Sequence, residues 1–317
     1  MKKHTSSLLA LLLLLTLWSC SKNSNTPDEP DNGNLCGNLL YDAGEQSYRL
    51  DLASNKRSVY FDRNTYALNG WDVSWDGGTR LETGSVTGEF DKVNFKLINT
   101  ANGALIKEFN YDTPNSEDRQ ISGLLSPDGN LILIQPDFNH GIVIIDTDGK
   151  VQHHLPVVNN TPLTLGDEVV WLPNNGILLT FQHFILKSDP PYNTITPIKE
   201  MNYADWGNIN VNRDGSKITV RVDKHIHLMH ADGSKMLQVT DSDRQEREAV
   251  FSPDGNHLLV AADHYPGTFH SGTWNLNIIP ADGKKYTVGN NPEESVRVIQ
   301  PDGQQQPEKA ANRMLWR

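Results

Sequence analysis

The stretch Glu248–Asn256, E-A-V-F-S-P-D-G-N, decides the fold of this chain. Its first half carries Ala249, Val250 and Phe251, residue types that suit a buried strand. The Pro-Asp-Gly that follows is a turn, because proline presets φ, aspartate accepts a local hydrogen bond and glycine tolerates a positive φ. A second apolar run, 257–262, comes directly after the turn. The stretch therefore predicts a β-hairpin.

Variants of this stretch recur along the chain at intervals of roughly 40 to 50 residues. They end at Gly77, Gly129, Asn175, Gly215, Gly255 and Gly303. Most intervals also hold further strand-like runs and a second turn, such as Asp148-Gly149 or Asp232-Gly233, and none shows sustained helical spacing. The pattern predicts an all-β chain, folded as a six-bladed β-propeller of four-stranded antiparallel blades.

These repeats resemble the WD40-like (PD40) repeats of TolB-type six-bladed propellers, in which F-S-P-D-G opens a blade and M-N-A-D-G closes its third strand. Phe251–Gly255 and Met229–Gly233 match the two patterns closely. The third repeat departs from them, with Asn174-Asn175 in place of Asp-Gly. Because asparagine also tolerates the left-handed region, we expect that turn to persist. The resemblance implies an architecture and is nearly silent on function.

The N- and C-terminal strands of the propeller are expected to share one blade. Residues Asn38–Tyr41, Tyr48–Leu52 and Ser58–Phe61 predict three outer strands of a blade that lacks its inner strand. Either Val296–Ile299 or Met314–Trp316 supplies it. The repeat spacing favours the first, and the three N-terminal strands favour the second. Either closure removes exposed sheet edges.

The N-terminal residues predict an export signal and an anchor. Two lysines precede the apolar run Leu8–Trp18, which is too short to cross a hydrocarbon layer of about 30 Å. The run ends in L-W-S-C, 17–20, which resembles the lipobox of bacterial lipoproteins, where the cysteine is lipidated. We therefore expect residues 1–19 to be a signal peptide and Cys20 to be the lipid attachment site. An ordinary secreted protein is the alternative.

Residues 20–34 are expected to be a lipid-anchored, disordered tether, because they contain almost nothing to bury, and residues 35–317 to be the propeller domain. This arrangement predicts a protein of the outer membrane, held by its lipid anchor alone, on either the periplasmic or the cell-surface side. The formal net charge of −11 argues against nucleic acid and anionic lipid headgroups as partners. Two cysteines, Cys20 and Cys36, cannot supply a disulfide framework, so a core must hold the fold.

Candidate binding residues gather on one side of the predicted ring. The S-P-D-G and A-D-G turns lie on one side of a propeller. The loops between second and third strands and the connections between blades lie on the other, here called the loop side. Loops on a regular scaffold are often functional. The candidate ligand-binding residues on the loop side are Asp137, His140, His183, Trp206, Asp223, Asp263, His264 and His270.

No catalytic residue is predicted, because the chain lacks a G-x-S-x-G elbow, a P-loop and a dinucleotide fingerprint. The histidines that could converge on a divalent metal are His264, His270 and His140. Histidines are common on surface loops, however, and no metal or other cofactor is expected. His225 and His227 lie on one face of a strand and are interpreted as structural.

The sequence therefore favours a non-catalytic envelope lipoprotein whose propeller binds or scaffolds a protein segment or a glycan. The second hypothesis is an enzyme. Propellers with PD40-like repeats include oligogalacturonate lyases, in which histidines hold a metal. The resemblance thus leaves open a metal-dependent polysaccharide lyase, or another carbohydrate-active enzyme, that uses the loop-side histidines. One equivalent of bound divalent ion, lost on His264→Ala, would favour the enzyme.

Overall fold

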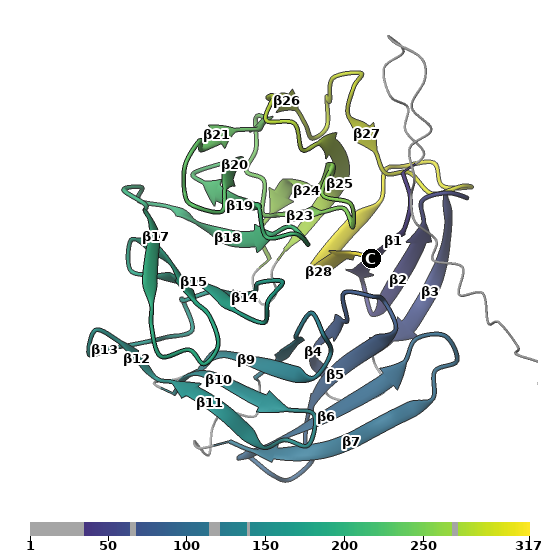
Figure 1. Cartoon of the computed structure of the whole chain (residues 1–317). Coiled ribbons are helices and arrows are strands. Elements are labelled where there is room, and N and C mark those ends of the chain that lie inside the picture. The colour runs from purple at the N-terminus through teal and green to yellow at the C-terminus, as the bar shows by residue number, and fades with distance from the viewer. Residues whose placement is uncertain (1–34, 64–67, 114–120, 138–139, 268–271) are drawn as a thin grey trace, which may run out of the picture.

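The computed structural model describes residues 35–63, 68–113, 121–137, 140–267 and 272–317. Every regular element in these residues is a β-strand, as predicted. Figure 1 shows the strands grouped into sheets around a common centre, in a propeller-like ring. The described ranges contain no apolar helix of membrane-spanning length.

Four of the sheets are separate, four-stranded and antiparallel. The first consists of β4 (Leu68–Val73), β5 (Thr79–Ser85), β6 (Lys92–Asn99) and β7 (Leu105–Asp112). The second consists of β8 (Gly123–Leu125), β9 (Leu131–Asp137), β10 (Gly141–Asp146) and β11 (Val151–Leu155). The third consists of β14 (Val169–Trp171), β15 (Ile177–Phe181), β16 (Phe184–Ser188) and β17 (Thr196–Glu200). The fourth consists of β18 (Trp206–Val211), β19 (Lys217–Val222), β20 (His225–His230) and β21 (Leu237–Gln238).

The other large sheet has eight strands, in the order β23-β24-β25-β28-β1-β2-β3, with β27 also paired to β25. Its strands are β23 (Ala249–Phe251), β24 (His257–Tyr265), β25 (Thr273–Pro280), β27 (Arg297–Val298), β28 (Lys309–Trp316), β1 (Asn38–Ala43), β2 (Gln46–Asp51) and β3 (Lys56–Asp62). Two short pairs join β12 (Val157–Val158) to β13 (Thr161–Pro162), and β22 (Thr240–Asp241) to β26 (Tyr286–Thr287). Four sheets are thus separate four-stranded blades, and the count of six blades stays a prediction.

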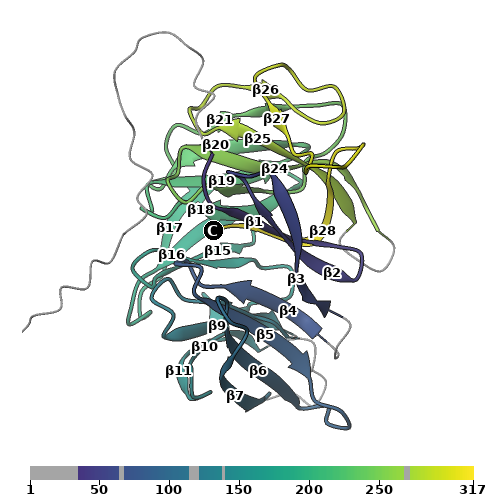
Figure 2. The same cartoon turned by 90° about the vertical axis from the view of Figure 1, so that its right-hand side faces the viewer.

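The pairing of β28 decides between the two predicted ways of joining the chain ends. Tyr41 of β1 lies opposite Met314, and Leu39 lies opposite Trp316, both in β28. Figures 1 and 2 show β1 and β28 side by side. The other predicted segment, which contains β27, pairs with β25 instead. The Met314–Trp316 alternative is therefore the one that holds.

Six clusters of buried apolar side chains lie between neighbouring groups of strands in the described residues. One of them joins the two halves of the eight-stranded sheet. Leu259 of β24 and Trp274 of β25 pack in this cluster with Leu50 of β2. Strands so far apart in the sheet order can meet only if the sheet bends between them, so that its two halves face each other.

The repeated S-P-D-G turns are held by side-chain hydrogen bonds. The Ser252 hydroxyl donates to Asp254 Oδ1 at 2.6 Å, and the same oxygen accepts the Asn256 amide at 3.1 Å. Gly255 then takes a φ of 71°. In the third repeat Asn175 occupies the glycine position with a φ of 59°, which confirms the expectation that asparagine preserves this turn.

The equivalent turn at Asp128 gives a pH-dependent prediction. Partial burial raises the pKa of Asp128, but hydrogen bonds from Ser126, Asn130 and Asn175 outweigh it and lower that pKa to about 2. A carboxyl with a lowered folded-state pKa stabilises the fold above its unfolded value of about 3.9, and this contribution is lost as the pH falls towards 2.

We expect Asp128→Asn to lower the free energy of unfolding by about 1 kcal/mol at pH 6, since solvent screens this exposed group. The difference from wild type should shrink towards zero at pH 2. Urea unfolding of both proteins at both pH values measures this difference in the free energy of unfolding. An equal difference at both would contradict the prediction.

Candidate functional site

The connections on the loop side contact one another and bring three predicted residues together. The His264 amide donates to the Gln245 carbonyl oxygen at 2.8 Å. The Gln245 side chain in turn donates to the carbonyl oxygen of Asp223 at 3.1 Å. Trp206 begins β18 opposite Val222, next to Asp223. Three of the predicted residues therefore belong to one linked part of the loop side.

A polar hollow of about 310 Å³ lies beside this link and contains a fourth predicted residue, Asp263. We call it the Asp263 hollow. It is formed by three segments that are distant in the sequence: the residues from the end of β22 onward, the end of β24, and the residues from the end of β26 onward. Its lining residues are Asp241, Ser242, Asp243, Arg244, Asp263, Thr287, Val288, Asn290 and Asn291.

A buried glutamate fixes one wall of the Asp263 hollow. Glu246 is fully buried and accepts hydrogen bonds from Ser242 Oγ at 2.5 Å and from Thr240 Oγ1 at 3.1 Å. His225 Nδ1 lies 3.0 Å from the same carboxylate. Burial raises the pKa of Glu246, and the bonds from Ser242 and His225 oppose that shift. His225 thus has the structural role that the sequence predicted for it, because it holds the segment that carries Arg244.

A second part of the hollow is held by amide groups. The Asn275 side chain donates to Asp263 Oδ2 at 3.0 Å and to Asn290 Oδ1 at 3.3 Å. Two residues beyond Asp263, the Tyr265 side chain is 66% exposed. The hollow therefore offers carboxylate, amide, hydroxyl and guanidinium groups, with an aromatic ring two residues further along β24. Such groups form hydrogen bonds with polar ligands.

The other predicted histidines lie apart from the hollow. His140 stacks on His154 of β11, with ring centroids 4.2 Å apart. His183 lies beside Phe184 and 3.9 Å from Glu200 of β17. Across the residues that the structure describes, no three His, Cys, Asp or Glu side chains are grouped so that they could hold a metal.

Three predicted residues cannot be placed in this way. His270 and Cys20 lie outside the described residues. Of Asp137 the structure describes the backbone, which pairs with Gly141. Trp274 of β25 is 1% exposed and belongs to the core between the halves of the eight-stranded sheet.

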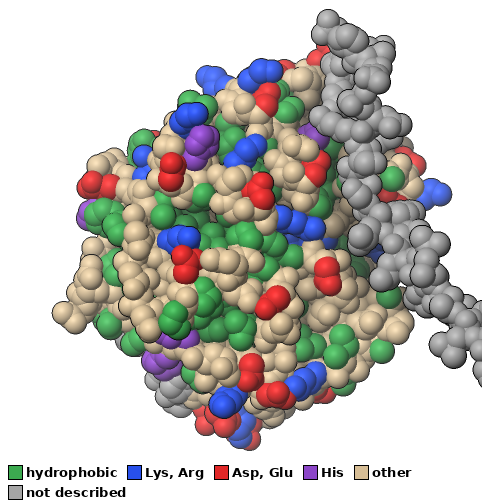
Figure 3. Space-filling view, viewed as in Figure 1, with side chains coloured by type: hydrophobic (Ala, Val, Ile, Leu, Met, Phe, Trp, Pro, Cys, Tyr) green, Lys and Arg blue, Asp and Glu red, His purple; other side chains and the backbone are tan. Residues whose placement is uncertain are grey.

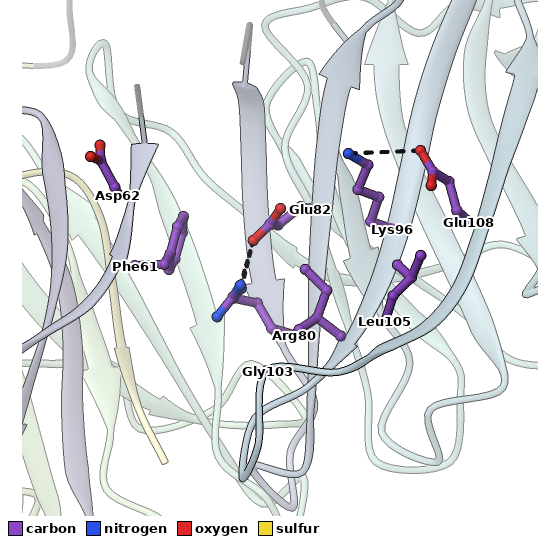
Figure 4. Close-up of a pocket in the computed structure, with 9 residues that line it drawn as sticks. Phe61, Asp62, Arg80, Glu82, Lys96, Gly103, Leu105 and Glu108 are labelled. Carbon is purple, nitrogen blue, oxygen red and sulfur yellow. Dashed lines mark hydrogen bonds and ion pairs between the residues drawn. The ribbon is translucent and has the colours of Figure 1, made fainter. Parts of the chain in front are cut away.

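A second concave region, of about 390 Å³, was not predicted from the sequence. It lies between β3 and the sheet β4–β7, and we call it the side groove. Figure 4 shows Phe61 and Asp62 on one wall, the Arg80–Glu82 ion pair in the middle and the Lys96–Glu108 pair with Leu105 on the other wall. Ile98 and Gly103 complete the lining.

Charged side chains of both signs are scattered over the face seen in Figure 3, which is viewed from the same side as Figure 1. Lys and Arg lie among Asp and Glu there, with hydrophobic side chains between them. The described part of this face therefore carries no large patch of one charge sign. Recognition at this surface depends on local groups more than on a field of one sign.

Known proteins resemble this chain in structure and not in sequence. No protein-family model matches the chain, and no curated protein matches it in sequence. A protein assigned as TolB from Agrobacterium tumefaciens has a similar structure, with a TM-score of 0.57 and 16% identity over 82% of this chain and 88% of that chain. TolB from Acinetobacter baumannii gives 0.59 and 16% over 84% of this chain and 66% of that chain.

A chain of a nidogen/laminin complex is also similar, with a TM-score of 0.54 and 10% identity over 78% of this chain and 93% of that chain. Structural similarity at identities this low shows the fold alone. The function has to be inferred from the residues of the site. The chain is an all-β protein with a propeller-like ring of sheets, and its structural neighbours are TolB β-propeller proteins.

Proposed function

We propose that this protein is a non-catalytic envelope lipoprotein whose propeller binds a protein segment or a glycan at the Asp263 hollow. The observation that carries the proposal is the convergence of three segments that are distant in the sequence, each held by partly buried hydrogen bonds, on one polar concave surface. Sites of this kind, with few oriented polar groups on a rigid scaffold, are typical of ligand binding. One structural neighbour belongs to a nidogen/laminin complex, an assembly of proteins.

We infer that the ring has six blades. The support is the number of apolar clusters in the described residues, one for each contact between neighbouring blades of such a ring. In this arrangement β28 joins two blades, because its start pairs with β25 and its end pairs with β1. The chain ends then share the blade β28-β1-β2-β3.

Two variants of the hollow test the proposed function. Asp263 has a φ of 51°, so Asp263→Asn keeps a residue that accepts this backbone and removes only the charge. Arg244→Ala removes the guanidinium from the facing wall. We expect each to weaken binding to purified envelope glycan or to detergent-extracted envelope protein by roughly tenfold, the effect of losing one charge-assisted hydrogen bond.

Cosedimentation with the glycan and affinity capture of the proteins measure this binding. Glu200→Ala, an exposed change on the outer strand β17, is the control and should bind as wild type does. Turnover of the glycan, abolished by His264→Ala, would overturn the proposal in favour of the enzyme.

The anchor is tested separately. We propose that residues 1–19 direct export and that lipidated Cys20 holds the domain at the outer membrane through the tether 20–34. Cys20→Ala should move the protein from the membrane fraction to the soluble fraction, because a single domain without its acyl chains has little membrane affinity. Fractionation followed by immunoblotting measures the shift. A Cys20→Ala variant that stays wholly in the membrane fraction would show a different attachment.

A further inference from the structure

Three arginine side chains gather around the end of β4. Arg317 Nε donates to the Val73 carbonyl oxygen at 3.0 Å. Arg213 Nη2 donates to the carbonyl oxygen of Trp75, two residues further along the chain. The third side chain, Arg313, reaches β4 from β28. We call these three side chains the arginine cluster.

The arginine cluster lies near the middle of the ring. Arg213 belongs to the repeat turn between β18 and β19, and Trp75 belongs to the repeat turn between β4 and β5. In the ring, the sheets β8–β11 and β14–β17 separate these two turns on one side, and the eight-stranded sheet separates them on the other. The bond from Arg213 to Trp75 therefore crosses the middle. Figure 1 shows that β28 also ends there.

Most of the groups that hold the cluster are neutral. In the part of the chain that the structure describes, Asp72 is the one carboxylate within ion-pair distance of the three arginines. Its Oδ1 lies 2.7 Å from Arg313 Nη2 and 3.8 Å from Arg317 Nη2. The remaining acceptors are main-chain carbonyl oxygens, which satisfy hydrogen bonds without cancelling charge. Three guanidinium charges thus meet one carboxylate.

Burial makes this excess of positive charge unfavourable. The Arg317 side chain is 18% exposed, and its burial lowers its pKa to about 10. Asp72 opposes that shift, whereas Arg213 and Arg313 add to it by charge repulsion. Burial lowers the pKa of Arg213 as well. Buried charges are normally paired, because an unpaired one loses its hydration without compensation. An added anion would supply the missing partner.

The cluster also retains hydrogen-bond donors for such an anion. A guanidinium has five N–H groups, and within the described residues Arg213 uses Nη2 alone. Arg313 Nε is buried and finds no acceptor among the described residues. The Arg313 side chain is nevertheless 30% exposed, so solvent reaches it. Donors and charge are therefore both in place at a point that a small solute can approach.

We propose that the arginine cluster is an anion-binding site that takes one carboxylate or phosphate group of a ligand. It lies among the repeat turns, on the opposite side of the ring from the Asp263 hollow, and shares no residue with it. Guanidinium groups bind carboxylate and phosphate oxygens in pairs of charge-assisted hydrogen bonds. The unused N–H groups of Arg213 and Arg313 bind the oxygens of the anion, and its charge balances that of Arg317.

Small anions test the proposal directly. Isothermal titration calorimetry of the full protein, at constant ionic strength set with chloride, measures the binding of malonate, inorganic phosphate and malonamide. Malonamide has the shape of malonate without its charge. We expect saturable binding of malonate or phosphate, and binding of malonamide at least roughly tenfold weaker. Tighter binding of malonate assigns the site to carboxylates, and tighter binding of phosphate assigns it to phosphate groups.

Protein variants locate the bound anion. Arg213→Gln removes one charge and keeps a hydrogen-bond donor, and it should weaken binding roughly tenfold. Arg213→Lys keeps the charge and should retain most of the affinity. Arg297→Gln makes the same change of charge at an exposed position of β27, and should bind as wild type does. Thermal unfolding checks that each variant is folded.

Three results would overturn the proposal. They are the absence of saturable binding of both anions, an unchanged affinity in Arg213→Gln, and an affinity that is lost in Arg244→Ala instead. The last would place the anion in the Asp263 hollow. Asp263→Asn should bind malonate as wild type does, so failure of the function proposed for the hollow would leave this test unaffected.

Discussion

Asp72→Ala should lower the free energy of unfolding by about 2 to 3 kcal/mol, because it leaves a buried amide without its acceptor and a partly buried arginine without its anionic partner. Asp72 lies in β4 with its side chain 4% exposed. One of its oxygens accepts the Leu125 amide of β8 at 2.9 Å, and the other lies 2.7 Å from Arg313 Nη2 of β28. A single carboxylate thus connects three groups of strands near the centre of the ring.

The size of the effect follows from what the alanine leaves behind. The Arg313 guanidinium would lose its close anionic partner, and the Leu125 amide would lose its acceptor. Buried donors without acceptors cost far more than the net value of the bonds that satisfied them. Guanidinium chloride unfolding of the purified domain measures the loss.

Asp72→Asn is the matched control, because it keeps an acceptor for the Leu125 amide and removes only the charge. It should cost less than the alanine variant. Combining Asp72→Ala with Arg313→Met removes the closest charged pair and leaves Arg317, which lies 3.8 Å from the same oxygen, so we expect the double variant to recover part of the loss. An Asp72→Ala protein as stable as wild type would show that the three groups of strands are held together by their apolar clusters alone.

Local turn chemistry explains why the fold could be predicted from the sequence. The S-P-D-G stretches carry their own geometry, since the serine hydroxyl and the aspartate carboxylate close each turn within a few residues. Asn175 preserves that geometry without glycine, so even the divergent repeat was predicted. The number of blades is a property of pairing between distant strands. The pairing of β28 with both β25 and β1 merges two expected blades into one sheet.

The candidate site was predicted only in part, because it forms where segments distant in the sequence contact one another. Asp263 was predicted as the first residue of a long loop, whereas the structure places it within β24, two residues before that strand ends. Arg244 and Asn290, which complete the same hollow, lie in connections with no repeat pattern. A signal for the side groove was present in the sequence. Polar residues, among them Lys96 and Glu108, alternate with apolar ones along β6 and β7. A strand buried on both faces would be apolar throughout, so this alternation indicates one exposed face.

Removal of residues 309–317 is expected to have the largest effect, which is the loss of cooperative unfolding at 25 °C. These residues contain β28 (Lys309–Trp316), which lies between β25 and β1. Its removal therefore exposes two sheet edges. It also removes Trp316, which is 1% exposed and donates from Nε1 to the Cys36 carbonyl oxygen at 3.0 Å. Loss of one buried tryptophan alone costs about 3 to 5 kcal/mol, a large part of the 5 to 15 kcal/mol of a typical domain.

The same experiment can separate the strand from the rest of the chain. A synthetic peptide of residues 309–317, added to the shortened protein, should restore hydrogen-exchange protection to the amides of β1, because it can pair there as β28 does. The Trp316→Ala peptide is the matched control and should restore much less, since it keeps the backbone hydrogen bonds but lacks the largest buried side chain. Both arms rest on the claim that β28 holds the two ends of the chain in one sheet. A shortened protein that still melts cooperatively within a few degrees of the full chain would contradict that claim, because the β1–β3 strands would then be held without it.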